Sequence, residues 1–215
     1  MIAILDYKAG NQTSVLRALN FLGIDACITD DNSTILNADG VIFPGVGAAK
    51  QAMDRLLEKK QDLLLKELVE KKKPLLGICL GCQILLEKSA ENNTKTLGII
   101  KGSCDKFDDS WTDGINENNI PQKIRIPHMG WNTLTIKKES PILKHLKTGD
   151  SIYYVHSFYP NPEDKNLIIA TSTYGKEFPA IYGYDGLWAI QFHPEKSGEI
   201  GLQILKNFND YCNNK

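Results

Sequence analysis

Two cysteines three residues apart are the most reactive side chains that this sequence places near a predicted turn. In "PLLGICLGCQILLE" an apolar run typical of a buried strand ends at Cys79, and a helical pattern that contains Cys82 begins. The unpaired amides and the positive dipole end of a helix stabilise a thiolate at such a junction, which favours Cys79 as a nucleophile. Gly77 and Gly81 predict a sharp turn that points its thiol out of the sheet. A buried structural cysteine is the competing interpretation.

A histidine and a glutamate follow another apolar run near the C-terminus. In "AIQFHPE", His193 and Glu195 lie two residues apart, and residues i and i+2 of an extended chain project on one face. Glu195 can then bond one imidazole nitrogen while the other nitrogen faces a thiol, which gives a nucleophile, a base and an orienting carboxylate. Taken alone, the two residues are equally typical of a surface ion pair.

Attack of a thiolate on an acyl carbon also needs hydrogen-bond donors for the oxygen that becomes negative. "FPGVGAA" follows an apolar run, and Gly45 and Gly47 predict a loop that presents backbone amides at close range. The amide of Leu80, one residue past Cys79, is the natural second donor. A plain strand-to-helix turn is the alternative for the two glycines.

The elements that must position these groups alternate in the first half of the chain. Apolar runs predict strands at 2–6, 25–29, 39–45 and 74–78, and helical stripes predict helices at 14–23, 49–73 and 82–90. The order β-α-β-β-α-β-α favours a parallel sheet with helices on its faces. Active sites in such sheets lie beyond the C-terminal strand ends, where Cys79 falls.

The second half has a different pattern. Beyond Leu97, short alternating runs separated by Gly, Pro, Asn and Asp predict strands, partly antiparallel, and residues 198–212 predict a helix that packs back on the sheet. The polar stretch 108–119 predicts a mobile surface loop. We therefore expect one α/β domain over residues 1–215, a three-layer, flavodoxin-like sandwich with a mostly parallel central sheet and added antiparallel strands.

Composition and charge limit the classes of partner that we expect this chain to bind. The 215 residues are 42% hydrophobic and 24% charged with a net charge of -1, which gives no electrostatic case for nucleic acid or an anionic membrane. No apolar run approaches the roughly 18 residues that cross a bilayer, and no basic segment precedes the first apolar residues. We expect a cytoplasmic protein that binds neither nucleic acid nor membrane. Its five scattered cysteines are expected to be reduced thiols.

Five motifs, which occur along the chain in the order typical of one enzyme family, resemble the motifs of that family. "PGVG", "GICLGCQILL" and "FHPEKSG" are similar to the motifs of class I glutamine amidotransferases, and the likeness extends nearly from end to end. "PHMGWN" at 127–132 and "LDYKAGN" at the start narrow it to the glutaminase subunits of imidazole glycerol phosphate synthases. The resemblance implies the fold of that family and an enzyme without a metal or a cofactor.

The resemblance also assigns roles to residues. Cys79 would attack the side-chain amide of glutamine, His193 would move the proton and Glu195 would orient His193, releasing ammonia and then glutamate. The oxyanion hole would comprise Val46, Gly47 and Leu80. Glutamine would be bound by Gly45, Gln83, His156, Ser157 and Phe158. A solvent-facing helix position is the alternative for Gln83.

A partner is implied as well. In the family the ammonia passes to a (β/α)8-barrel cyclase subunit in a heterodimer, and the matching contact candidates are Asn11, Trp131 and Lys196, with a core aromatic as the alternative for Trp131. This chain has Cys82 where methionine is commoner, and polar stretches that leave the acceptor open. The alternative is a paralogous glutaminase that supplies ammonia to a surface-sugar amidotransferase.

Three rival classes explain less of the sequence. A thiol-disulfide oxidoreductase built on Cys79 and Cys82 leaves "FHPE" and "PGVG" unexplained. A structural zinc site needs further ligands at suitable spacing, which the other cysteines do not offer. A binding module without catalysis would not need Cys79, His193 and Glu195 together.

Overall fold

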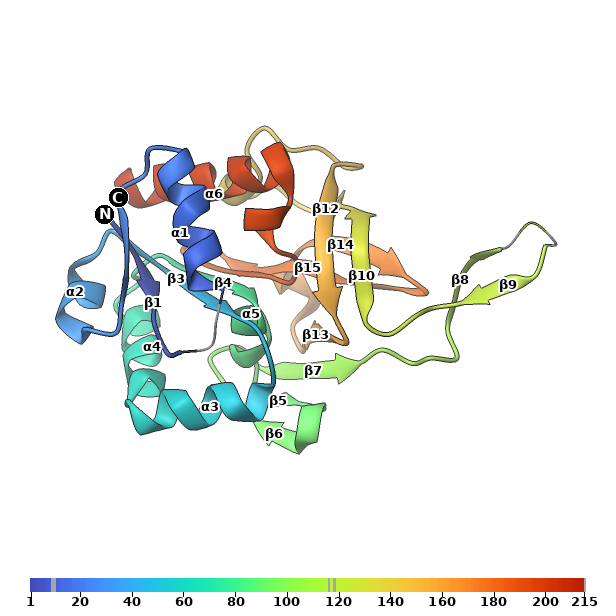
Figure 1. Ribbon diagram of the computed structural model, residues 1–215, viewed down its shortest axis with the longest axis horizontal. Coiled ribbons are helices and arrows are strands. Elements are labelled where there is room, and N and C mark those ends of the chain that lie inside the picture. Colours follow the sequence, from blue (N-terminus) through green and yellow to red (C-terminus); the bar gives the residue numbers. More distant parts are fainter. Residues whose placement is uncertain (9–10, 116, 118, 215) are drawn as a thin grey trace.

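An eight-stranded sheet forms the centre of the computed structural model, which describes residues 1–8, 11–115, 117 and 119–214 (Figure 1). The strand order is β11-β14-β15-β16-β4-β3-β1-β2. Five neighbouring strands run parallel: β2 (Ala26–Thr29), β1 (Ile2–Leu5), β3 (Gly40–Gly45), β4 (Leu75–Cys79) and β16 (Leu187–Ile190). The other three continue the sheet in antiparallel pairs: β15 (Lys176–Tyr184), β14 (Ile168–Tyr174) and β11 (Thr135–Ile136).

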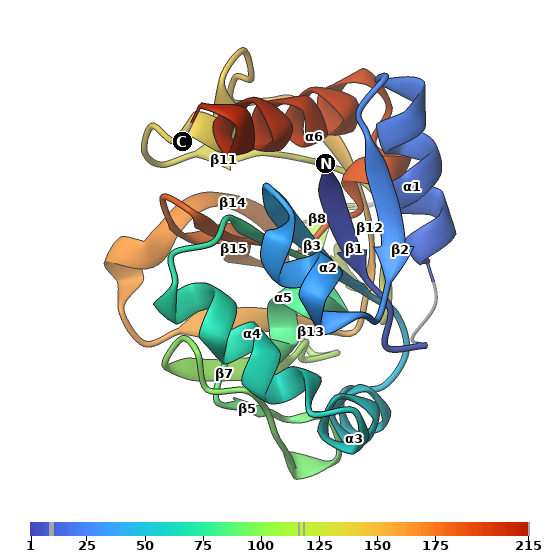
Figure 2. The same ribbon diagram turned by 90° about the vertical axis from the view of Figure 1, so that its left-hand side faces the viewer.

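Helices cover both faces of this sheet (Figure 2). One face carries α1 (Gln12–Phe21) and α6 (Gly198–Asn213). The other face carries α3 (Ala49–Glu58), α4 (Gln61–Glu70) and α5 (Leu80–Ile84), with the short α2 (Asn32–Asn37) near the sheet edge. The predicted three-layer α/β sandwich, including the C-terminal helix that packs on the sheet, is confirmed.

Side-chain alternation along the strands explains why both faces are covered. Ile2 and Ile4 of β1 belong to the apolar cluster that includes Leu19 of α1, whereas Ala3 belongs to the cluster that includes Leu56 of α3. Because both faces of a parallel strand are buried, it appears in the sequence as a continuous apolar run. The two clusters form the two core layers of the sandwich.

Smaller sheets pack beside the central one. One has the order β13-β7-β5-β6 and a second pairs β10 with β12. Their bounds are β13 (Phe158–Pro162), β7 (Gly102–Lys106), β5 (Lys88–Ser89), β6 (Thr94–Lys95), β10 (His128–Thr133) and β12 (Ser151–His156). The described residues also form four short 3-10 helices: η1 (Glu91–Asn93), η2 (Pro141–Leu143), η3 (Lys165–Leu167) and η4 (Pro194–Lys196). The predicted strand-rich second half is confirmed.

Two predicted helices were too long. The helix expected over 49–73 is broken between α3 and α4, where Lys60 adopts a φ of 56° and the buried Gln61 donates from Nε2 to the carbonyl of Asp6 at 3.2 Å. The helix expected over 82–90 ends at Ile84, because residues 88–89 form strand β5 with two strands that lie further along the chain. In both places a long-range contact overrides a local helical pattern.

The polar stretch 108–119 is not wholly irregular. Residues Thr112–Ile115 form β8, which pairs antiparallel with β9 (Pro121–Lys123), and the hairpin extends from the body of the protein (Figure 1). This corrects the loop prediction for β8, and Asn116 and Asn118 lie outside the described residues. The ring of Trp111 lies at the base of the hairpin, 6.2 Å from that of Phe107.

Three further predictions concern membranes, thiols and metals. No helix among the described residues is long and apolar enough to cross a membrane. All five cysteines carry thiols, as expected. Within the described ranges, no group of three or more His, Cys, Asp or Glu side chains is arranged to hold a metal ion.

Candidate active site

Cys79 lies at a strained turn between strand and helix. It is the last residue of β4 and the N-cap of α5, with φ 53° and ψ -109°. Non-glycine residues rarely adopt a positive φ, and such strain clusters at functional sites. Cys79 is about 7% exposed and lines a surface cavity. The elbow that the sequence predicts is therefore present.

The glycines beside Cys79 have a different role from the one predicted. Neither Gly77 nor Gly81 has a positive φ, so the turn is made by Cys79 itself. A Cβ on Gly81 would lie 1.9 Å from the carbonyl oxygen of Phe43, and one on Gly77 would lie 2.9 Å from Leu85. The two glycines allow α5 to approach the strands closely, which holds the helix N-terminus beneath the thiol.

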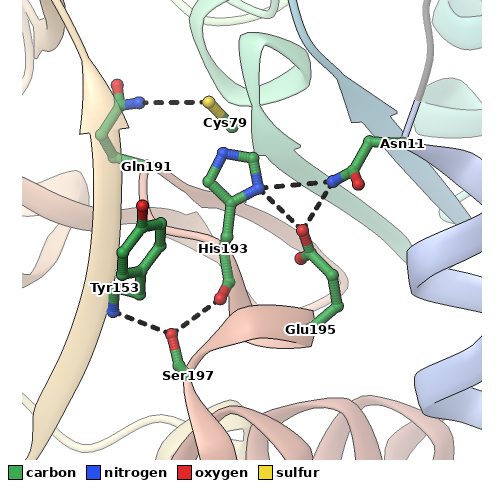
Figure 3. A network of polar contacts seen from close by, with 7 residues as sticks. All are labelled: Asn11, Cys79, Tyr153, Gln191, His193, Glu195 and Ser197. Carbon is green, nitrogen blue, oxygen red and sulfur yellow. Dashed lines mark hydrogen bonds and ion pairs between the residues drawn. The ribbon is translucent and has the colours of Figure 1, made fainter. Parts of the chain in front are cut away.

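His193 and Glu195 follow β16 and meet as predicted, although by a different backbone route. The amide of His193 donates to the carbonyl of Tyr153 at 3.0 Å, and Glu195 lies in the 3-10 turn η4 rather than in an extended strand. His193 Nδ1 lies 2.8 Å from Glu195 Oε1. Figure 3 shows the other ring nitrogen, Nε2, turned toward Cys79. The three predicted triad residues therefore lie in one row.

The surroundings of His193 and Glu195 shift the pKa values of both side chains. Burial alone lowers the pKa of His193, but the negative charge and hydrogen bond of Cys79, followed by Glu195, raise it to about 10. Burial raises the pKa of Glu195, yet the hydrogen bonds from His193 and Asn11 bring it below its ordinary value. The surroundings therefore favour the protonated form of His193.

A fourth side chain belongs to this network. Asn11, predicted as a partner contact, turns its Nδ2 to Glu195 Oε1 at 2.6 Å and lies 3.4 Å from His193 Nδ1 (Figure 3). It is the N-cap residue of α1 in a left-handed conformation, with φ 70°. The N-terminus of α1 is thereby joined directly to the carboxylate of Glu195.

A cavity of about 330 Å³ opens over the thiol of Cys79. Its walls include both predicted oxyanion-hole segments, and Leu80 is the first residue of α5, where helix geometry leaves backbone amides unpaired. Most of the predicted substrate contacts also line it. The lining comprises Val46, Gly47, Cys79, Leu80, Gln83, Glu91, Pro127, Val155, His156, Ser157, Phe158 and His193.

Two positions differ from the predicted substrate site. Gly45 does not line the cavity but pairs with Cys79 in the register of β3 and β4. Glu91 was missed, although this residue lines the cavity and its Oε2 accepts from the amide of Ala49 at 2.6 Å. No sequence signal singled out Glu91, because it lies in the short η1 segment, which β5 and β6 flank on either side.

A family model described as "Glutamine amidotransferase class-I" matches residues 3–210. The chain belongs to this family. Two relatives carry the name "Imidazole glycerol phosphate synthase subunit HisH". The one from Nitratidesulfovibrio vulgaris is 56% identical over 99% of this chain and 97% of its own length. The one from Listeria innocua is 46% identical over 98% of this chain and 95% of its own length. This amidotransferase is therefore an enzyme.

Solved structures agree with the fold. A structure titled "Crystal structure of glutamine amidotransferase" superposes with a TM-score of 0.73 at 16% identity, covering 99% of this chain and 98% of its own. "Structure of PurLQS from Thermotoga maritima" gives a TM-score of 0.72 at 18% identity, covering 98% of this chain and 97% of its own. At these identities the likeness supports the class I amidotransferase fold alone.

The remaining partner candidates lie on the surface of this amidotransferase. Trp131 on β10 is 59% exposed, so it is not a core aromatic, and Lys196 of η4 is exposed. The ring of Trp131 makes an edge contact with Tyr153, 6.0 Å between centroids. The backbone carbonyl of Tyr153 accepts a hydrogen bond from the amide of His193. Tyr153 therefore links the exposed ring of Trp131 to the backbone of His193.

Proposed function

We propose that this chain is the glutaminase subunit of an imidazole glycerol phosphate synthase. It hydrolyses glutamine to glutamate and ammonia and passes the ammonia to a cyclase subunit in histidine biosynthesis. The identity to relatives of that name over nearly the whole chain supports this function. The observation that carries the chemistry is His193, bound to Glu195 at 2.8 Å and turned toward a thiol that borders a cavity.

The residues divide the reaction into two balanced steps. The Cys79 thiolate attacks the side-chain amide carbon of glutamine, and amides of Val46, Gly47 and Leu80 stabilise the oxygen that becomes negative. Protonated His193 gives its proton to the departing nitrogen, so ammonia leaves and a glutamyl thioester remains. Neutral His193 then takes a proton from water, whose oxygen attacks the thioester to release glutamate and restore the thiolate.

The cavity suits the amino-acid end of glutamine. Glu91 contributes the only carboxylate among the described lining residues, and we assign to it the α-ammonium group. Gln83 and residues 156–158, which line the same cavity, supply further polar contacts in this proposal. Gly45, one residue before the predicted oxyanion-hole loop, contributes by holding that loop beside Cys79 rather than by touching glutamine.

The partner in this proposal is a (β/α)8-barrel cyclase subunit, bound in a cytoplasmic heterodimer through Asn11, Trp131 and Lys196. The whole chain acts as one amidotransferase domain. Asn11 bonds Glu195, and Trp131 reaches the His193 backbone through Tyr153, so a partner that moves either residue would affect the triad. We expect weak glutaminase activity alone and activation by the partner. The relatives' common name favours this acceptor over a surface-sugar amidotransferase.

The experiment that tests the proposal measures ammonia release from glutamine by the purified chain. It is run alone, with a histidine-pathway cyclase and its nucleotide ligand, and with a surface-sugar amidotransferase. We expect strong stimulation by the cyclase with its nucleotide ligand and no stimulation by the surface-sugar amidotransferase. Stimulation only by the sugar enzyme would overturn the assigned acceptor while leaving the glutaminase chemistry in place.

A further inference from the structure

One buried glutamine side chain lies between the two cysteines. Gln191, just after β16 and two residues before His193, is fully buried. Its Oε1 lies 3.8 Å from the sulfur of Cys82, and its Nε2 lies 3.8 Å from the sulfur of Cys79, the contact drawn in Figure 3. A glutamine amide has one donor end and one acceptor end. The orientation of this amide therefore decides which sulfur receives a hydrogen bond.

The orientation follows from a neighbour that can only accept. The carbonyl oxygen of Phe158 has no hydrogen to give, so Gln83 must turn Nε2 toward it, at 2.9 Å. The same Nε2 lies 2.8 Å from the side-chain oxygen of Gln191 and donates its second hydrogen there. Gln191 consequently presents Oε1 to Gln83 and Cys82, and Nε2 to Cys79.

A histidine also contacts the Phe158 carbonyl, and a second histidine bonds the first. His156 Nδ1 lies 2.7 Å from the oxygen of Phe158, so Nδ1 carries the hydrogen and Nε2 accepts. His128 donates from Nδ1 to that Nε2 at 3.0 Å, and its own Nε2 accepts from Asn132 at 3.3 Å. Burial lowers the pKa of His128 to about 4 and that of His156 to about 3, so both rings are neutral at pH 7. With both rings neutral, the donor and the acceptor of each of these hydrogen bonds are fixed.

The two sulfurs consequently meet opposite ends of one amide. Cys82 is fully buried, and burial raises its pKa, so it remains a thiol that can donate to Gln191 Oε1. Cys79 borders the cavity at the N-terminus of α5 and receives the Gln191 amide hydrogen. A hydrogen bond to a charged acceptor is stronger than one to a neutral acceptor, so the arrangement favours the negative charge on Cys79.

We propose that Gln191 is a further catalytic residue of this amidotransferase, whose amide donates to the Cys79 thiolate. Gln83 is a positioning residue that sets the direction of that amide, and His156 is a positioning residue that holds the Phe158 carbonyl to which Gln83 donates. The proposal rests on the role of Cys79 in the proposed function. It gives a physical reason why only one of two cysteines three residues apart is the nucleophile.

The test follows alkylation of Cys79 by iodoacetamide as a function of pH in the full chain, with the modified peptide quantified by mass spectrometry. Gln191→Met removes both ends of the amide and keeps the side-chain length. We expect the midpoint of the rate profile to rise by about one pH unit, because the thiolate loses a charge-assisted hydrogen bond. Gln203→Met, which alters a glutamine of α6 bonded to Asn207, is the matched control and should leave the midpoint unchanged. An unchanged midpoint in folded Gln191→Met would overturn the proposal.

Variants of His156 keep the test decisive if Gln191→Met does not fold. His156→Leu removes the donor to the Phe158 carbonyl and should raise the midpoint in the same direction. His156→Asn places a nitrogen donor near the position of Nδ1 and should restore at least half of the shift. Equal midpoints in both variants and in the wild type would overturn the orienting role.

Glutamine hydrolysis measured on the same preparations separates this inference from the function on which it rests. If Cys79→Ser retains wild-type hydrolysis, the proposed function fails, whereas the alkylation midpoint still reports on Gln191. If Cys79→Ser is inactive and the midpoint does not respond to Gln191→Met, only the inference about Gln191 fails.

Discussion

The amide nitrogen of Asn11 lies 2.6 Å from Glu195 Oε1, the same oxygen that contacts His193. The carboxylate that contacts His193 is therefore itself held by a hydrogen bond from a residue at the start of α1. A charge-assisted hydrogen bond of this length restricts the carboxylate rotation and stabilises its negative charge. Asn11 thus joins the triad to the N-terminal end of the first helix, at a residue that the sequence predicts to meet a partner.

Removal of that hydrogen bond should slow glutamine turnover. We expect Asn11→Ala to lower kcat by about tenfold, because Glu195 loses a partner and holds His193 less firmly. Asn11→Asp should be worse, since it places a second carboxylate beside the first. Asn20→Ala, at an exposed position of the same helix, serves as the control. A kcat of Asn11→Ala equal to that of the control would contradict this role.

The neutral histidine pair makes stability fall in mild acid. An unfolded histidine has a pKa of about 6.5, whereas burial lowers the pKa of His128 to about 4 and that of His156 to about 3. Between those values the unfolded chain binds more protons, so the free energy of unfolding rises with pH and is fully present above about 6.5. His193 does not contribute to this loss, because its raised pKa keeps it protonated in both states below that pH.

Urea unfolding at two pH values measures the effect. The pair should make the wild type about 2 kcal/mol less stable at pH 5.5 than at pH 6.5, beyond any change shared with a His128→Gln/His156→Gln variant. The rings of Tyr154 and Tyr174 stack on His128, and neither residue is changed in the double variant. Parallel stability profiles for the wild type and the double variant would show that the pair is not neutral in the fold.

The close contact between α5 and β3 beside Cys79 predicts a large loss of stability in the Gly81→Ala variant. Gly81→Ala would place a Cβ 1.9 Å from the carbonyl oxygen of Phe43, so α5 must shift or the chain must unfold. We expect a loss of about 3 kcal/mol or more in the free energy of unfolding. Gly23→Ala has open space but a φ of 70°, and it measures the cost of a left-handed backbone alone. If Gly81→Ala costs no more than Gly23→Ala, the close packing of α5 is not as described.

The exposed tryptophan should matter to the partner and not to basal hydrolysis. Trp131→Ala should weaken binding of the cyclase by about tenfold or more, because large exposed aromatic residues are frequent binding hot spots. Tyr184→Ala is the control, since Tyr184 is exposed beside the first residue of β16, at the opposite end of the sheet from His193. Titration of ammonia release with cyclase distinguishes the two variants, and equal affinities would remove Trp131 from the interface.

The sequence predicts the parallel part of the fold well, because each strand buried on both faces leaves an apolar run of its own. The prediction fails where contacts with residues distant in sequence determine the local secondary structure. Lys60 breaks the predicted helix without any glycine or proline to mark the break, and Lys88 leaves the predicted helix for a strand partner at Ser103. The short α2 was missed, although Asp31 caps it by accepting from Thr34, a local signal that was present in the sequence.

The candidate site likewise contains residues that the sequence predicts and residues that only the fold identifies. The sequence points to Cys79, His193 and Glu195 because each follows an apolar run, and the structure places the three side chains together. Gln191 was missed, although a polar residue inside "AIQFHPE" at the same i, i+2 spacing as His193 and Glu195 is a usable signal. Its role depends on contacts with Gln83, more than a hundred residues away, whose direction only the Phe158 carbonyl fixes. That information lies in the fold and not in the motif.

The most direct measurement of the central claim compares glutamine hydrolysis by Cys79→Ala and Cys82→Ala, each in complex with a cyclase that stimulates the wild type. Only Cys79 borders the cavity that His193 also lines, whereas Cys82 is fully buried. We predict that ammonia release is abolished in Cys79→Ala and largely retained in Cys82→Ala. Activity in Cys79→Ala together with its loss in a folded Cys82→Ala would contradict the account.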